Sequence, residues 1–180
     1  ISVTRAYLAR IKALDRKGPK LNSILALNPN ALADAKALDL ERKAGHVRGP
    51  LHGMPLLLKD NIEAADMATT AGSLALAANV THRNAPLVQR LTDAGAVILG
   101  KNNLSEWANF MTGNSVNGFS ALGGPTRNAY GRYDVSGSSS GSSSLSPSVT
   151  ASPSLTPTIA PTGTSTATAT LSFLASPSNT

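Results

Sequence analysis

Cysteine is absent from all 180 residues of the chain. Its absence excludes disulfide bonds, a thiol nucleophile and thiolate metal ligands. The three histidines, His46, His52 and His82, do not have the spacing of metal-binding motifs, so we expect neither a metal site nor a catalytic histidine. No cofactor-binding motif is present either, and we expect no cofactor.

Long apolar runs are also missing. No stretch approaches the roughly 18 consecutive apolar residues of a transmembrane helix, so we expect no membrane partner. The chain begins at Ile1, inside a helical pattern, and we expect its natural N-terminus to lie before this residue. A cytoplasmic location is favoured, with a signal peptide in the preceding residues as the alternative.

Aromatic residues make up only 4% of the chain, and no recognised nucleic-acid-binding motif is present. The formal net charge is +6, from 16 basic and 10 acidic residues. A basic chain can indicate a nucleic-acid partner, but these basic residues are spread along the sequence. We therefore expect no nucleic-acid partner.

Charged residues are absent after Asp134. From Leu145 onward serine, threonine and proline dominate, a composition that neither maintains a helix nor buries enough apolar area to offset the entropy of ordering. We therefore expect a structured domain at residues 1–144 and a disordered Ser/Thr/Pro-rich tail at residues 145–180.

Apolar periodicity predicts two helices in the first part of the chain. The first is capped by Ser2 and has Val3, Tyr7 and Ile11 on its apolar face. The second is capped by Asn28, with a proline at its first position. We see no chemistry in either helix and interpret both as scaffold.

Apolar runs predict strands at residues 24–27, 56–58 and 96–99, and a helix at residues 84–94. A strand, a helix and a strand with short connections indicate parallel neighbours in one sheet. The predicted fold class is therefore α/β, with a mixed sheet flanked by helices.

Lys59 follows the run of three leucines at residues 56–58, which suits a strand covered on both faces. A lysine at the end of such a strand is partly desolvated, which lowers its pKa and makes the neutral amine accessible as a base. The alternative is a lysine whose ammonium reaches solvent over the leucines. Lys101 follows the next apolar strand in the same way, and composition does not choose between the two lysines.

A second polar segment, GSSSGSSS at residues 137–144, could supply the hydroxyl that a lysine base activates. Its glycines let the backbone approach a substrate and offer N–H groups to a developing oxyanion. A flexible linker is the alternative interpretation of a Ser/Gly run taken alone.

Four segments together resemble the amidase signature family. They are GPLHGMPLLLKDNI at residues 49–62, TTAGS at 69–73, AGAVILGKNNLSEWANF at 94–110 and GSSSG at 137–141, in the order of the family. The resemblance implies a partial amidase-signature fold at residues 1–144 and an enzyme that hydrolyses linear carboxamides to an acid and ammonia or an amine. Its partner would be a small-molecule amide substrate.

The resemblance also implies a Ser–cis-Ser–Lys triad. Lys59 would be the general base, Ser139 the bridging serine after a cis peptide bond, and Lys101 a structural lysine. Substrate contacts are expected from Trp107, Ala108, Phe110 and Ser140, with core packing as the alternative role of the aromatic side chains.

The nucleophile that the family carries in a T-D-x-G-S motif, about two dozen residues after Ser139, is missing. The chain reads PTGTST at residues 161–166, with hydroxyls but without the aspartate or the Gly-Ser pair. We assign no nucleophile and expect this chain alone to hydrolyse amides poorly or not at all. Three origins of the tail compete: a shifted reading frame or exon end, a genuine O-glycosylated stalk, and a diverged non-catalytic member.

Other functions therefore stay open beside the amidase. One is a pseudoenzyme that binds an amide or a partner chain without turnover. Another is a surface or cell-wall protein defined by its tail. Transamidation within a tRNA-modifying complex is a further variant within the enzyme class.

Overall fold

The structure of the chain is a computed structural model and describes residues 1–110 and 117–129. Its elements in chain order are α1 (Ser2–Ile11), the π-helical turn η1 (Lys12–Arg16), β1 (Ile24–Leu27), α2 (Ala31–Lys43), β2 (Pro55–Lys59), the 3₁₀ turn η2 (Leu74–Leu76), α3 (Pro86–Asp93), β3 (Val97–Asn102), the 3₁₀ turn η3 (Glu106–Asn109), β4 (Phe119–Ser120) and β5 (Gly124–Pro125). Each strand predicted from the sequence is present.

The main sheet has three strands in the order β1–β3–β2. β3 lies in the centre, parallel to β2 and antiparallel to β1, and all six of its residues are buried. A central strand with a layer on each face has no solvated side, which is why its sequence is apolar from Val97 to Leu99. The predicted α/β class with a mixed sheet flanked by helices is confirmed.

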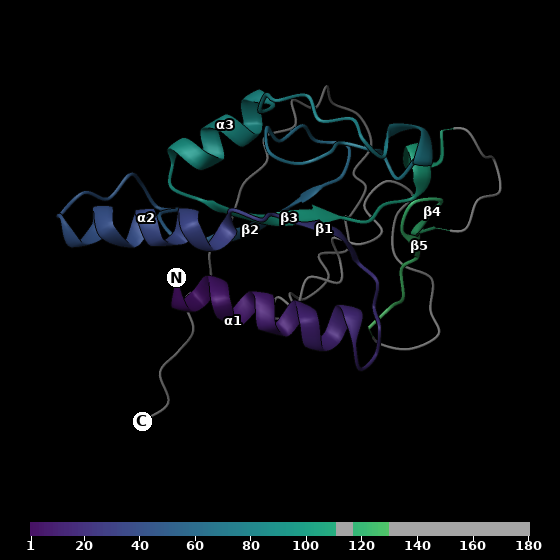
Figure 1. Cartoon of the computed structure of the whole chain (residues 1–180), viewed down its shortest axis with the longest axis horizontal. Helices are drawn as coiled ribbons and strands as arrows, with labels where there is room; N and C mark the ends of the chain where they lie inside the picture. The colour runs from purple at the N-terminus through teal and green to yellow at the C-terminus, as the bar shows by residue number, and fades with distance from the viewer. Residues whose placement is uncertain (111–116, 130–180) are drawn as a thin grey trace, which may run out of the picture. The chain divides into compact units, whose positions relative to one another are not determined.

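Each face of the sheet has its own apolar cluster, and Figure 1 shows α3 above the strands and α1 below them. On the α1 side the buried residues are Ala31, Ala35, Leu38, Val97 and Leu99, with Ile1, Leu8, Ile11 and Leu57 packed against them. On the α3 side they are Leu58, Ala64, Met67, Val88 and Ile98, with Leu56, Ile62, Ala85 and Leu91 around them. The leucine run of β2 therefore contributes to both cores, as predicted for a strand covered on both faces.

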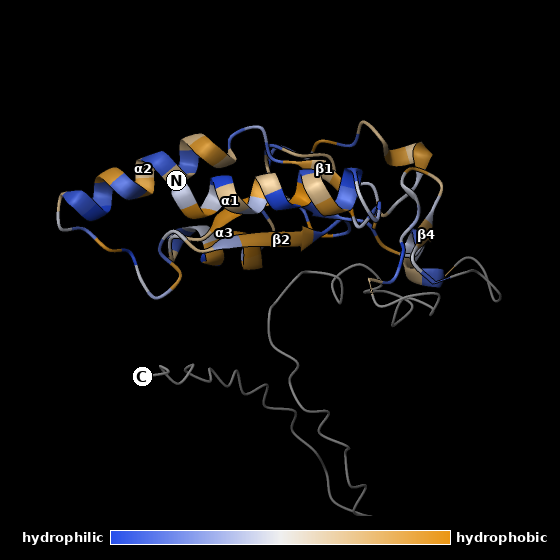
Figure 2. Cartoon of the chain, turned by 90° about the horizontal axis from the view of Figure 1, so that it is seen from below, coloured by the Kyte–Doolittle hydropathy of each residue, from blue (hydrophilic) through white to orange (hydrophobic). Residues whose placement is uncertain are grey.

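Hydropathy follows this layering (Figure 2). β2 is drawn almost wholly in the hydrophobic colour, whereas α1 and α2 alternate between the two colours along their length. Such alternation is typical of helices that place one face on a core and the other in solvent. No helix in residues 1–110 or 117–129 is long and apolar enough to cross a membrane.

The predicted apolar face of α1 is wrong. Val3 and Tyr7 are 51% and 40% exposed, and Thr4 is the buried residue of the helix. A second stripe with helical spacing runs through Thr4, Leu8 and Ile11 to Asp15, and this stripe faces the sheet. Composition favoured the first stripe, but the buried Asp15 fixes the second because its Oδ1 accepts hydrogen bonds from Ser23 N and Oγ at 2.5 and 2.7 Å.

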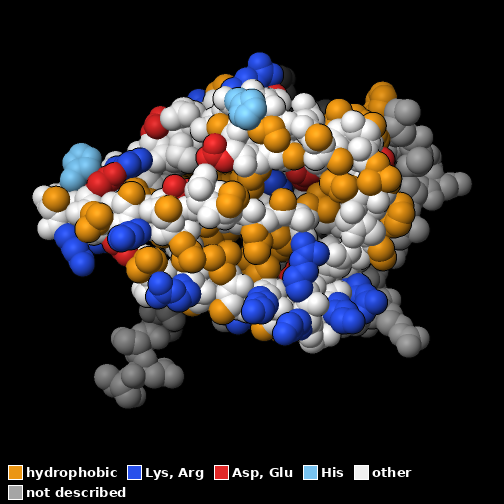
Figure 3. Space-filling model, in the orientation of Figure 1, with side chains coloured by type: hydrophobic (Ala, Val, Ile, Leu, Met, Phe, Trp, Pro, Cys, Tyr) orange, Lys and Arg blue, Asp and Glu red, His pale blue; other side chains and the backbone are white. Residues whose placement is uncertain are grey.

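Basic side chains gather on the outer side of this part of the fold. Figure 3 shows Lys and Arg grouped along the part of the surface that α1 forms, although the sequence spreads its basic residues over the whole length. The helix collects them because residues that do not face the sheet share its solvent side.

The second helix begins later than predicted. α2 starts at Ala31, and Asn28 lies three residues before it, where its Oδ1 accepts a hydrogen bond from Asn30 N at 2.9 Å. Asn28 thus forms a turn that precedes the helix rather than a direct cap. The helix predicted at residues 84–94 is α3, which Gly95 follows with φ +90° as expected of a stop.

Gly100 sets the approach of β1 to β3, and we expect Gly100→Ala to destabilise the fold. An alanine Cβ would lie 2.2 Å from Ala26 O and 3.0 Å from Leu27 Cα, both backbone atoms that cannot turn aside. The expected loss in the free energy of unfolding is about 1–3 kcal/mol, measured by urea denaturation. Gly49→Ala is the matched control because its Cβ would meet its nearest atom, Ala94 O, at an ordinary 3.5 Å. Equal midpoints for both variants would contradict the prediction.

Candidate active site

Lys59 ends strand β2 beside the end of the central strand β3. Lys59 and Asn102 are register partners across the two parallel strands, so the carboxyl ends of both strands meet at one edge of the sheet. The Lys59 side chain is partly buried, and this burial lowers its pKa. A lower pKa enlarges the fraction of neutral amine, which is the form that accepts a proton.

Lys101 lies one residue before Asn102 and is fully buried. Its Nζ donates to Ile62 O at 2.6 Å, to Thr69 Oγ1 at 3.3 Å and to Asp60 Oδ1 at 3.4 Å. Burial lowers the pKa of Lys101, while the Asp60 carboxylate opposes that shift. The three contacts match the three N–H donors of an ammonium, so no donor is left over for a substrate.

The Asp60 carboxylate joins the end of β2 to the TTAGS segment. It is 2% exposed, and its Oδ2 accepts hydrogen bonds from Thr70 N at 3.1 Å, from Gly72 N at 3.4 Å and from Thr70 Oγ1. Ala71 N donates to the Asp60 backbone carbonyl at 3.2 Å. The chain directly after Lys59 is therefore held on both sides, by Lys101 and by this loop.

Three of the predicted substrate contacts lie around turn η3. Trp107 and Ala108 have left-handed backbone angles, φ 50° and 55°, and Trp107 N donates to Ala71 O at 3.0 Å. Trp107 is 39% exposed and Phe110 is 89% exposed. The alternative of core packing is therefore wrong for Phe110. The turn packs against the TTAGS segment, which places it in the neighbourhood of the β2 end.

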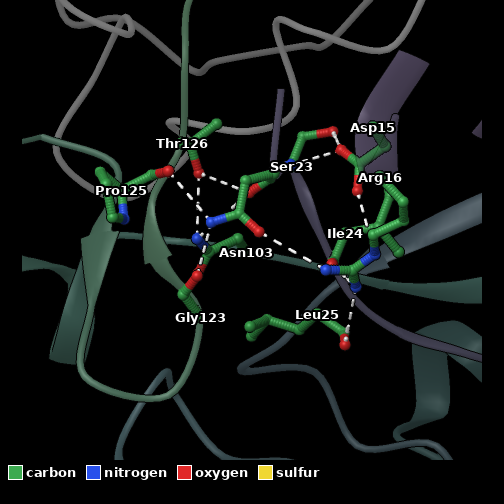
Figure 4. Close-up of polar contacts among 10 residues, drawn as sticks. Asp15, Arg16, Ser23, Ile24, Leu25, Asn103, Gly123, Pro125 and Thr126 are labelled. Atoms are coloured by element: carbon green, nitrogen blue, oxygen red, sulfur yellow. Dashed lines mark hydrogen bonds and ion pairs between the residues drawn. The ribbon is translucent and has the colours of Figure 1, made fainter. Parts of the chain in front are cut away.

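Sequence reasoning missed Asn103, which organises the segment after β3. Its Nδ2 donates to Gly124 O and Thr126 Oγ1, each at 3.0 Å, and its Oδ1 accepts from Ser120 Oγ at 2.7 Å. Figure 4 shows Asn103 between Thr126, which directly follows β5, and the segment that carries Ser23. A buried asparagine directly after an apolar strand was the available signal, because such a side chain requires partners.

Comparisons with known proteins show the family of the chain. The Amidase family model matches residues 2–150. A relative from Arthroderma benhamiae, named as an amidase, is 45% identical over 142 residues, which are 78% of this chain and 24% of the relative. The chain belongs to the amidase family.

Solved amidase structures share its fold. The native peptide amidase of Stenotrophomonas maltophilia is 61% identical with a TM-score of 0.71, over 72% of this chain and 26% of that one. A peptide amidase in complex with the competitive inhibitor chymostatin is 60% identical with a TM-score of 0.75, over 78% of this chain and 29% of that one. The chain spans about a quarter of the length of these relatives.

Ser139 and Ser140 lie outside the described residues, as do the hydroxyl residues near position 163. The structure therefore brings together the Lys59 end of β2, the TTAGS loop and turn η3. The roles of Lys59 and Ser139, and those of Trp107, Ala108, Phe110 and Ser140 in substrate binding, remain predictions from the resemblance to the amidase signature family.

A cavity of about 270 Å³ lies elsewhere, between α2, α3 and the loop after β2. Its lining includes Asp34 and Asp66, and burial, together with the charge of Asp66, raises the pKa of Asp34. Ile98 is the β3 residue in its wall, four positions before Asn102, and Lys59 does not line it. None of the predicted site residues in the described part of the chain lines this cavity.

Proposed function

We propose that this chain carries the base-bearing part of a serine amidase that hydrolyses a carboxamide to an acid and ammonia or an amine. The observation that supports the proposal is the position of Lys59. It ends the partly buried strand β2 in the KDN segment of an amidase-family chain, where burial lowers its pKa. Among the two lysines at strand ends, Lys59 has no carboxylate among the causes of its pKa shift, whereas Lys101 has Asp60.

The proposed reaction proceeds through two serines. Neutral Lys59 takes a proton from Ser139, and Ser139 takes one from the nucleophilic serine as that serine attacks the carboxamide carbon. Backbone N–H groups stabilise the oxyanion of the tetrahedral intermediate. The leaving amine departs with a proton returned through the same relay, and water then hydrolyses the acyl-enzyme to the free acid.

A peptide amide is the substrate class that we propose. Two solved relatives at 60% and 61% identity are described as peptide amidases. In this chain, Trp107, Ala108 and Phe110 would contact the acyl side of such a substrate, together with Ser140. Phe110 is available for that contact because its side chain is 89% exposed.

The chain lacks the T-D-x-G-S motif that would carry the nucleophilic serine, and the coding DNA shows whether another reading frame supplies it. We propose sequencing the coding DNA and its transcript through codons 136–180 and translating all three forward frames. A T-D-x-G-S motif about two dozen codons after Ser139 in another frame would support the amidase. The chain continued in that frame is called the intact enzyme below. Absence of the motif from every frame, with a matching transcript, would overturn the enzyme proposal for this polypeptide.

The missing T-D-x-G-S motif also favours a second candidate, a pseudoenzyme that binds amides without turnover. Ammonia release and peptide-amide binding, measured on the same preparation, separate the two. Binding that is lost on mutation of the site, without any acid product, would support the pseudoenzyme. Release of ammonia by the intact enzyme, with none from this chain alone, would support the amidase.

We expect the activity of the intact enzyme to rise with pH. Burial lowers the pKa of Lys59, and only the neutral amine is a base, so kcat/KM should increase through an apparent pKa below that of an ordinary lysine. The measurement is kcat/KM for a peptide amide against pH. A profile without an ionisation below the ordinary lysine range would contradict the assignment.

A further inference from the structure

Asn102 is a buried polar residue that the proposed mechanism does not use. It ends β3, is 6% exposed, and its Oδ1 has no hydrogen-bond partner among the described residues. Leaving a buried carbonyl oxygen without a partner costs about 1–3 kcal/mol, so few folded proteins keep one without a reason. The neighbouring Asn103 shows the usual state, with partners for both Oδ1 and Nδ2.

The register of the sheet places Asn102 beside Lys59. The two residues are direct partners across β2 and β3, and paired residues of adjacent strands direct their side chains to the same face. That face is the α1 side, because Leu57, two residues before Lys59, packs into the cluster on that side. Lys101 instead faces the other side, where it contacts Thr69 and the Ile62 carbonyl.

We propose that the Asn102 side-chain oxygen accepts a hydrogen bond from the Lys59 amine and thereby positions the base. The inference rests on the proposed role of Lys59. A neutral amine has two N–H donors and one lone pair, so an acceptor that binds one N–H fixes the direction of the lone pair. Asn102 is a positioning residue in this proposal, since it acts through Lys59 and not on the substrate.

An amide oxygen suits this role better than a carboxylate does. A carboxylate next to the amine would favour the ammonium and raise the pKa of the base, whereas an uncharged oxygen orients it at a smaller cost in basicity. The charged groups nearby are already paired with one another. Asp15 lies 3.5 Å from Arg16 on the α1 side, and Asp60 lies 3.4 Å from Lys101 on the opposite side. Asn102 is thus an uncharged acceptor at the strand position beside the base. The Asp15 carboxylate, although ion-paired, keeps one oxygen, Oδ2, without a hydrogen-bond partner among the described residues.

The test is an NMR titration of Lys59 in this chain, which needs no turnover. The Cε resonance of Lys59 is followed against pH in the wild type, Asn102→Leu and Asn102→Asp, with Asn30→Leu and Asn30→Asp as matched controls. Asn30 is an exposed asparagine that follows β1 at the other end of the sheet. We expect Asn102→Leu to lower the pKa of Lys59, because an ammonium loses an acceptor, and Asn102→Asp to raise it by about one unit or more. The Asn30 variants should leave it unchanged.

Thermal unfolding separates positioning from packing. Asn102→Leu replaces a polar group by an apolar one of similar size. If Asn102 is a positioning residue, we expect an unchanged or higher Tm together with a shifted Lys59 pKa. A lower Tm with an unshifted Lys59 pKa would assign Asn102 to packing and overturn the proposal. If Asn102→Leu does not fold, the Asn102→Asp variant decides the question. A Lys59 pKa in Asn102→Asp equal to the Lys59 pKa in Asn30→Asp would overturn the proposal.

Kinetics of the intact enzyme complete the test. We expect Asn102→Leu to lower kcat by about 10- to 100-fold with little change in KM, because a misplaced base affects the chemical step. The titration and the kinetics fail independently. A Lys59 pKa that shifts in the Asn102 variants, without any amidase activity, would overturn the proposed function alone. An active enzyme whose Lys59 pKa does not respond to the Asn102 variants would overturn the role of Asn102 alone.

Discussion

Lys59→Ala should lower kcat/KM of the intact enzyme for a peptide amide by about 10⁴-fold or more. Without the amine, nothing in the relay takes the proton from Ser139, and the nucleophilic serine stays a weakly reactive hydroxyl. Lys59→Arg should lose as much, because a guanidinium keeps its proton at any working pH although it preserves the charge and much of the length. The measurement is ammonia release at substrate concentrations around KM.

The control for this prediction is Lys36→Ala, which removes an exposed lysine of α2 and should leave turnover unchanged. Each variant also needs a wild-type Tm, since loss of folding would imitate loss of catalysis. Turnover of Lys59→Ala close to that of the wild type would remove Lys59 from the mechanism. In that case Lys101 would not simply replace it, because its ammonium already has three protein partners.

The second large effect concerns stability. Lys101→Met should lower the free energy of unfolding by about 3–5 kcal/mol, because it leaves the Asp60 carboxylate buried without its cation. Both side chains are almost fully inaccessible, at 0% and 2% exposure, so solvent cannot replace the lost partner. The variant can be measured by urea denaturation of this chain, with the slope compared to that of the wild type.

A double variant isolates the pair. Asp60→Asn in the Lys101→Met background removes the unpaired charge and should recover part of the loss, which a double-mutant cycle quantifies. Arg83→Met is the matched control, because its ion pair with Glu63 leaves the arginine side chain 73% exposed. An exposed pair of this kind contributes about 0–1 kcal/mol. A loss for Lys101→Met no larger than that of Arg83→Met would contradict the buried-pair argument.

These two predictions separate neighbouring lysines that the sequence presents in the same way. Each follows an apolar strand, and each is desolvated enough to lower its pKa. Burial and contacts distinguish them, because Lys101 is fully buried and Lys59 only partly. Lys101 is surrounded by Asp60, Thr69 and the Ile62 carbonyl, whereas burial alone is the cause of the Lys59 shift.

Strands and the C-terminal end of α3 were predictable because their signals are local, whereas the start of α2 was not. Three leucines bounded by polar residues predict a covered strand, and a glycine after a periodic segment predicts the end of a helix, as Gly95 does after α3. The parallel pairing of β2 with β3 followed from the helix between them, since a short strand–helix–strand unit brings the two strands side by side.

The helix α1 shows where local signals stop. Its sequence holds two stripes of helical spacing, one with Val3 and Tyr7 and one with Thr4 and Leu8, and hydrophobicity favours the first. The fold buries the second because Asp15 at its end binds Ser23. A contact with a residue outside the helix decided which face packs, and no periodicity within the helix encodes that contact.

By itself the sequence determined the α/β class, the positions of the strands and the membership in the amidase family. Those properties depend on apolar runs, turn residues and motif order, which are read along the chain. The tertiary structure alone decided that Lys101 is enclosed by Asp60, that the TTAGS loop is held to the end of β2, and that Asn102 lies beside Lys59 with an unpaired oxygen. The residues in these pairs are up to 43 positions apart in the sequence. Only the folding of the strands into one sheet brings them close together.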